Sequence, residues 1–146
     1  MTAFFDTNIV VYAFSTDAKR DRAIKTIAPG GIISAQVLNE FTNVLRNKQR
    51  QSWAVIEAVI RTARAQFGGI RPLTAETHAA ALLLARDHNL SFYDALIVAS
   101  ALEAGCDTLY SEDMQNGRAF GDLKIINPFA AETKSTPTPS SPGSGS

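Results

Sequence analysis

The sequence predicts an α/β fold in which a central, mainly parallel sheet of four or five strands lies between two layers of helices. Short apolar runs alternate along the chain with longer amphipathic segments, which indicates strands separated by helices. This order favours parallel strands joined by right-handed crossovers, with helices on both faces of the sheet. A length of 146 residues and a hydrophobic content of 45% suit one domain with its own core.

In the first half of the chain, glycine, proline and serine mark the ends of the elements. Pro29 and the two glycines after it end a charged helix, and Ser34 can cap the helix that follows the second strand. Gly68 and Gly69 end a further amphipathic helix. The expected elements, in chain order, are a strand at 2–5, a helix from about Ile9, a helix at 17–28, a strand at 32–33, helices at 35–49 and 52–67, and a strand at 70–73.

The second half contains the most apolar helix, DALIVASALEAG. Because this segment is apolar nearly all round, it should be buried against more than one neighbour, and Gly105 suits its C-terminal end. Thr74 can cap the helix before it. The expected elements are helices at 75–88 and 94–105 and strands at 108–111 and 124–127. The Ser/Thr/Pro/Gly-rich ending lacks apolar periodicity, so we expect a folded domain at 1–131 and a disordered tail at 132–146.

Charge, cysteine content and hydropathy narrow the class of protein. A formal net charge of zero argues against a protein that coats nucleic acid broadly, although the first 72 residues hold ten Lys/Arg against five Asp/Glu. Cys106 is the single cysteine, which excludes an internal disulfide and a cysteine-based zinc cluster. No apolar run approaches the ~18 residues that cross a bilayer, and no secretory signal is visible. We therefore expect a cytoplasmic enzyme or binding domain without a membrane partner.

Four carboxylates occupy positions that a parallel sheet would bring together. Asp6 and Asp113 directly follow predicted strands, and sites in such sheets form outside the carboxyl ends of the strands. Glu40 lies on the border of an apolar helix stripe, and Asp94 opens the most apolar helix. Singly, each has a structural explanation as a helix cap, a solvated helix residue or a polar turn, and Asp94 could complete a capping box with Ser91.

Taken together, the four acids predict a site for a divalent cation. Several carboxylates in one cleft repel one another and remain partly protonated without a counter-charge. A hard cation supplies that charge, and all-oxygen ligands favour Mg²⁺ or Mn²⁺ over zinc. His78 and His88 both fall on one predicted surface helix, away from the acids, which argues against a histidine metal site. The implied chemistry is metal-assisted attack of water on a phosphorus centre.

The motifs FFDTN, NEF, FYDALIVASAL and YSEDMQNG resemble those of the PIN-domain ribonucleases, and most of all the VapC-type toxins of type II toxin–antitoxin systems. The resemblance covers residues 1–129, with the motifs in the family's order. It implies a PIN-like three-layer α/β/α sandwich and an endoribonuclease that uses one or two Mg²⁺ or Mn²⁺ ions. It also implies an RNA substrate, a homodimer, and a cognate antitoxin whose C-terminal segment occupies the active-site groove.

The resemblance also carries roles to individual residues. It assigns the metal-binding catalytic cluster to Asp6, Glu40, Asp94 and Asp113. Asn8 would orient Asp6 or a metal-bound water, and Ser111 would fix a carboxylate or a water. Many relatives have another Asp where this chain has Gln115. Gln115 would act only through water, and whether a second metal ion binds stays open. Three basic residues become candidates for RNA phosphate contacts: Arg46, Lys48 and Arg50.

Two other interpretations remain open at this point. FFDTNIV and the late acidic pair also resemble the motifs of haloacid-dehalogenase-like phosphatases, in which Asp6 would be a covalent nucleophile. Against this, Asn8 stands where the general acid should be Asp, and no Lys lies between Lys48 and Lys124 to hold the phosphate. The other interpretation is a non-catalytic binding domain with a PIN fold. Its signature would be the loss of one core acid, and all four are present.

Overall fold

In the computed structural model, which describes residues 2–130, six strands form one sheet in the order β3-β2-β1-β4-β6-β5. Neighbouring strands are parallel except β5 and β6, which are antiparallel. The strands are β1 (Ala3–Phe5), β2 (Ile32–Ser34), β3 (Gly69–Arg71), β4 (Thr108–Tyr110), β5 (Ala119–Phe120) and β6 (Leu123–Ile126). The sheet is therefore mainly parallel, as the alternation of strands and helices predicts.

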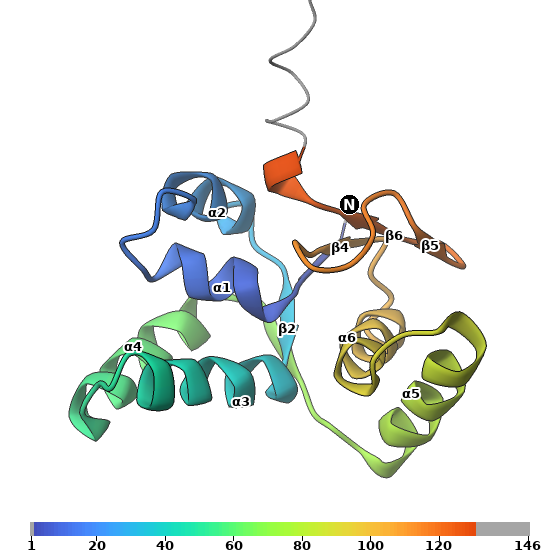
Figure 1. Cartoon of the computed structure of the whole chain (residues 1–146), viewed down its shortest axis with the longest axis horizontal. Coiled ribbons are helices and arrows are strands. Elements are labelled where there is room, and N and C mark those ends of the chain that lie inside the picture. The colour runs from blue at the N-terminus through green and yellow to red at the C-terminus, as the bar shows by residue number, and fades with distance from the viewer. Residues whose placement is uncertain (1, 131–146) are drawn as a thin grey trace, which may run out of the picture.

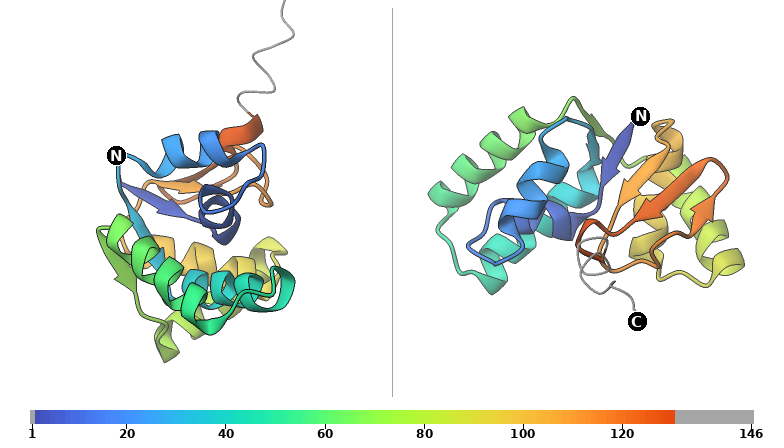
Figure 2. Two further views of the ribbon diagram at one scale, coloured as in Figure 1. Left: turned by 90° about the vertical axis from the view of Figure 1, so that its left-hand side faces the viewer. Right: turned by 90° about the horizontal axis from the view of Figure 1, so that it is seen from above.

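Helices cover both faces of this sheet. Figure 1 shows the course of the chain, and Figure 2 shows α2 on one side of the sheet with α5 and α6 on the other. The helices are α1 (Thr7–Ala13), α2 (Arg20–Ile27), α3 (Ala35–Asn43), the π-helical η1 (Val44–Lys48), α4 (Trp53–Gln66), α5 (Ala75–His88) and α6 (Phe92–Glu103). Within residues 2–130, no helix combines the length and apolar character needed to cross a membrane.

The predicted fold class is confirmed, and the structure adds detail that the sequence pattern did not contain. The sheet has six strands where four or five were expected, and the strand missed in the sequence is β5, which is only two residues long and produces no alternation. The helix expected at 35–49 passes at Val44 into a π-helical turn. The first helix begins at Thr7 rather than Ile9, because the side chain of Asp6 caps it. The tail predicted at 132–146 lies outside the described residues.

Hydroxyl side chains begin the longer helices. Ser34 and Thr74 cap α3 and α5 as predicted, each accepting a hydrogen bond from the backbone N–H three residues later. Thr74 and Thr77 form a complete capping box. Ser91 accepts from the backbone N–H of Asp94 at 3.2 Å, which supplies one half of the box predicted there. These caps fix where α3 and α6 leave the edge of the sheet.

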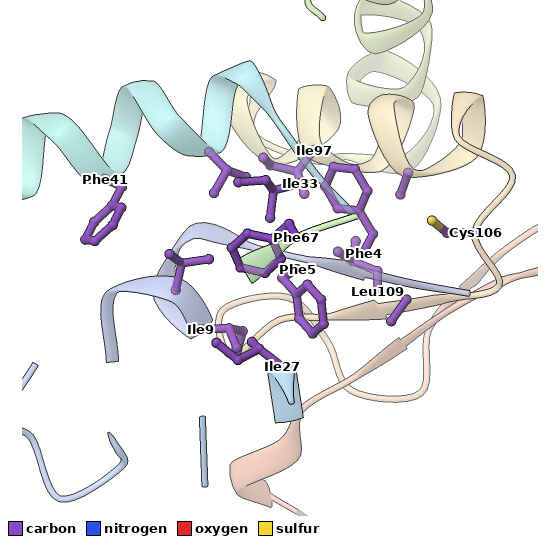
Figure 3. Packing of buried hydrophobic residues seen from close by; sticks show 14 of the residues in the cluster. Phe4, Phe5, Ile9, Ile27, Ile33, Phe41, Phe67, Ile97, Cys106 and Leu109 are labelled. Carbon is purple, nitrogen blue, oxygen red and sulfur yellow. The ribbon is translucent and has the colours of Figure 1, made fainter. Parts of the chain in front are cut away.

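The core lies on both faces of β1, the central strand. Consecutive residues of a strand point to opposite faces, and Figure 3 shows Phe4 beside Ile97 of α6 and Phe5 on the other side toward Ile27 of α2. Both phenylalanines are fully buried. Every residue from 95 to 101 of α6 is buried, as predicted for the most apolar helix. The sheet edge that carries the candidate site therefore rests on a rigid, well-packed base.

Gly31, just before β2, provides a test of the packing against β1. Its φ is +155°, and a Cβ atom there would lie 2.6 Å from the carbonyl oxygen of Ala3 and 2.5 Å from the ring of Phe5. We expect Gly31→Ala to lower the free energy of unfolding by about 2 kcal/mol, measured by urea denaturation. Gly30→Ala is the matched control, since Gly30 has a φ of +95° but no atom within 4 Å of its Cβ position. Equal losses in the two variants would show that backbone strain, not the contact with β1, sets the cost.

Candidate active site

The carboxyl ends of β1, β2 and β4 meet at one edge of the sheet, and the predicted acids lie there. Asp6 directly follows β1, and Asp113 lies three residues beyond β4. Glu40 is on α3, which begins directly after β2, and Asp94 is in the first turn of α6. Figure 1 shows α1, α3 and α6 gathered around the end of β2. The arrangement matches the expectation that parallel strands place their sites at this edge.

Asp6 is the most buried member of this cluster, with 6% of its surface exposed. One carboxylate oxygen accepts a hydrogen bond from the backbone N–H of Thr7 at 2.7 Å, and the other accepts from the hydroxyl of Ser111 at 2.7 Å. Burial, and to a lesser degree the charges of Asp94 and Glu40, nevertheless raise the pKa of Asp6 from 3.8 to about 6. Asp6 therefore both caps α1 and carries a charge that the folded protein opposes.

Glu40 is held by two buried polar side chains. The hydroxyl of Thr7 donates to Oε1, and Nε2 of Gln36 donates to Oε2 at 3.1 Å. Thr7 is 6% exposed and Gln36 is 9% exposed. Neither residue was predicted to belong to the site. The spacing of Gln36 four residues before Glu40 on one helix was an available signal, because such pairs face the same way.

Asp94 and Asp113 complete the group of acids. Asp94 is partly buried, and its pKa is raised first by that burial and then by the charges of Asp113 and Glu40. Asp113 is exposed and accepts a hydrogen bond from Nδ2 of Asn8 at 2.6 Å. Asn8 was expected to orient Asp6 or a water, whereas the structure places it on Asp113.

The other two predicted supporting residues differ in how closely they join the cluster. Ser111 is fully buried, and besides donating to Asp6 its hydroxyl accepts from the backbone N–H of Met114 at 3.3 Å. It thereby ties the loop after β4 to the junction between β1 and α1. Gln115 is exposed, two residues beyond Asp113.

The three basic residues predicted as phosphate contacts lie farther along the helical run that carries Glu40. They are exposed on η1 and directly after it: Arg46, Lys48 and Arg50. The guanidinium of Arg46 lies 4.5 Å from the ring centroid of Trp53, and Nη1 donates to the carbonyl of Gln51 at 3.1 Å. Because Trp53 is 56% exposed, the pair presents a cationic and aromatic surface to solvent.

The four acids are the type of ligand that a hard divalent cation prefers, but in this structure they lie too far apart to bind one ion together. Across residues 2–130, no three carboxylate, imidazole or thiol groups lie close enough to ligate one ion as they stand. The charges that raise the pKa values of Asp6 and Asp94 are those of other carboxylates. A cation would relieve this repulsion, and an oxygen-only set is what Mg²⁺ and Mn²⁺ prefer.

Comparison with known proteins gives a family match over most of the described chain. A family model for the PIN domain matches residues 3–119. The fold is similar to that of VapC20 from Mycobacterium tuberculosis, a sarcin–ricin loop cleaving toxin, with a TM-score of 0.64 and 23% identity over 77% of this chain and 90% of that chain. No curated protein matches the chain.

Two further solved structures share the fold. A toxin–antitoxin complex from Klebsiella pneumoniae gives a TM-score of 0.67 with 21% identity over 87% of this chain and 98% of that chain. VapBC2 from Rickettsia felis, bound to a DNA fragment from its promoter, gives a TM-score of 0.65 with 18% identity over 87% of this chain and 98% of that chain. At these identities the likeness shows a common fold, and the segment matched by the family model contains all four acids of the site.

Proposed function

The chain belongs to the PIN-domain family, and from this premise we propose that it is a metal-dependent endoribonuclease that acts as the toxin of a toxin–antitoxin pair. The observation that carries the proposal is the meeting of four carboxylates at one edge of the sheet, with a buried Asp6 whose pKa is raised to about 6. Such a site disfavours its own charge and is therefore prepared for a cation. The substrate is RNA, cut to leave 5′-phosphate and 3′-hydroxyl ends.

The proposed ligands of one or two Mg²⁺ or Mn²⁺ ions are Asp6, Glu40, Asp94 and Asp113. When bound, the metal supplies activation of water and neutralisation of charge on the phosphodiester. The other residues of the site hold these carboxylates in place. Ser111 fixes Asp6, Thr7 and Gln36 fix Glu40, and Asn8 fixes Asp113. Partners of this kind orient metal ligands and raise the affinity of the site.

The residue at position 8 argues against the phosphatase alternative. Such a phosphatase needs Asp6 as its covalent nucleophile and a general acid two residues later. The proposed general-acid position is Asn8, whose amide is bound to Asp113. The non-catalytic alternative has no replaced acid to support it. We therefore propose only the nuclease.

The proposed partners follow from the same relatives. Complexes of a toxin with its antitoxin are among the proteins that share the fold, which supports an antitoxin as the protein partner of this chain. A homodimer stays a prediction from the family resemblance. For RNA, the exposed pair of Arg46 and Trp53 offers a cation for phosphate and a ring for base stacking.

The proposal is tested by RNA cleavage with purified protein that has been freed of any antitoxin. We expect cutting in the presence of Mg²⁺ or Mn²⁺, loss of cutting on addition of EDTA, and recovery when excess metal is returned. Ca²⁺, which prefers larger and more flexible oxygen sites, is the matched control ion. Cleavage that continues in EDTA after dialysis against the chelator would contradict the metal-dependent mechanism.

A further inference from the structure

Glu112, the residue before Asp113, makes polar contacts of its own, separate from the contact between Asp113 and Asn8. Glu112 accepts a hydrogen bond from the hydroxyl of Tyr12 at 2.7 Å and forms an ion pair with the ammonium group of Lys19. The side chain of Glu112 is 19% exposed, whereas Asp113 is open to solvent. The two neighbouring acids therefore face different surroundings, and only Asp113 joins the candidate active site.

Aromatic rings back the ion pair. Nζ of Lys19 lies 5.1 Å from the ring centroid of Tyr12 and 5.3 Å from that of Phe129. The rings of Tyr12 and Phe129 meet edge to face, with their centroids 5.4 Å apart. Such rings keep water from one side of the pair and favour a cation over their faces. The carboxylate of Glu112 is thus held at a defined place rather than lying loose on the surface.

The same helix face holds both acids of the loop. Asn8 and Tyr12 are four residues apart on α1 and therefore face the same way. Asn8 donates to Asp113 and Tyr12 donates to Glu112, so consecutive loop residues rest on consecutive turns of α1. Nδ2 of Asn127 also reaches the backbone carbonyl of Glu112 at 3.5 Å. Asp113 is exposed and lies beyond the end of β4, so its position depends on how this loop is anchored.

From this geometry we propose that Glu112 is a positioning residue that keeps Asp113 in the metal site by anchoring the loop after β4 to Tyr12 and Lys19. The inference rests on the proposed function of the acid cluster. Without the anchor, the loop keeps the bonds from Asn8 to Asp113 and from Ser111 to Asp6 but loses those of Glu112, so Asp113 moves more freely and cation binding weakens. Folding is less affected, because α1 and β4 keep their own buried residues, among them Ile9 and Leu109.

The test measures Mn²⁺ binding to the full chain by electron paramagnetic resonance, which reports free Mn²⁺ and needs no RNA. We expect Glu112→Gln to raise the Kd for Mn²⁺ about tenfold, as loss of a partner that orients a metal ligand commonly does. Tyr12→Phe keeps the ring on Phe129 and removes only the hydrogen bond, so it should raise the Kd by a smaller factor. Asp122→Asn removes the same charge from an exposed position between β5 and β6 and should leave the Kd within about twofold of the unmodified chain.

Cleavage assays separate positioning from a general loss of structure. We expect Glu112→Gln to raise the Mn²⁺ concentration for half-maximal cutting while kcat at saturating Mn²⁺ and KM for RNA stay near the values of the unmodified chain. A structural defect would lower kcat at every Mn²⁺ concentration instead. Unchanged Mn²⁺ affinity in Glu112→Gln, or an equal loss in Asp122→Asn, overturns the inference. A chain that binds Mn²⁺ in this Glu112-dependent way but cuts no RNA would refute the proposed function and leave the inference supported.

Discussion

Asp94→Asn is expected to lower RNA cleavage by about a thousandfold, which corresponds to about 4 kcal/mol of lost transition-state stabilisation. The substitution removes one proposed metal ligand with almost no change in volume. The backbone N–H of Asp94 donates the capping bond to Ser91, and the substitution leaves this bond in place. Because burial and neighbouring carboxylates raise the pKa of Asp94, the metal-free variant should unfold at the same temperature as the unmodified chain or a higher one.

Two measurements decide the role of Asp94. Cleavage rates with Mg²⁺ report its part in the chemistry, and thermal unfolding in EDTA reports its part in the fold. Asp122→Asn, at an exposed position between β5 and β6, serves as the control for loss of one negative charge. Undiminished cutting by Asp94→Asn would remove this residue from the proposed cluster. A large fall in the unfolding temperature would instead show that the carboxylate is needed to begin α6.

The architecture was predictable because its signals are local. The sequence of α6 is apolar on nearly all sides of the helix, and its residues 95 to 101 are all buried. Residues that directly follow parallel strands come together because the carboxyl ends of such strands share one edge, and Ser111 after β4 accordingly donates to Asp6 after β1. The two-residue β5 and the π-helical turn η1 were not predictable, because neither is long enough to produce a period.

The contacts between residues of the candidate site were much less predictable than which residues form it. Asn8 was expected to orient Asp6 or a metal-bound water, and in the structure its amide donates to Asp113, which lies 105 residues away. Thr7 received no role from sequence, yet its hydroxyl holds Glu40. Which partner a side chain takes depends on its direction and on the path of a distant loop, and residue periodicity reports neither. The same reason explains why the contact of Glu112 with Tyr12 and Lys19 became visible only in the structure.

The stability of the metal-free protein should fall as the pH rises from 4.5 to 7.5, and Asp6 should be a main cause. Its pKa is about 6 in the folded state, against 3.8 for an ordinary Asp. The folded state therefore binds more protons than the unfolded state between these two values, so stability decreases as pH rises through this range. A difference of about two pKa units corresponds to about 3 kcal/mol of free energy of unfolding, and this stabilisation is fully lost once the pH is above the folded-state pKa of Asp6. Asp94, whose pKa is also raised, contributes in the same direction.

Asp6→Asn isolates this effect, because the amide oxygen can still accept from the N–H of Thr7 and the amide nitrogen can donate to Ser111. Urea denaturation in EDTA should find the variant about 3 kcal/mol more stable than the unmodified chain at pH 7.5 but only about 1 kcal/mol more stable at pH 4.5, where part of the cost is already present. Adding Mn²⁺ at about 100 times its Kd should stabilise the unmodified chain at pH 7.5 by about 2.7 kcal/mol and the variant by much less. A variant that is less stable than the unmodified chain at both pH values would mean that Asp6 serves chiefly to begin α1. Without metal, the negative charge of Asp6 lowers the stability of the fold, and a bound cation should offset this loss. Metal binding and the stability of the fold are therefore linked at this site.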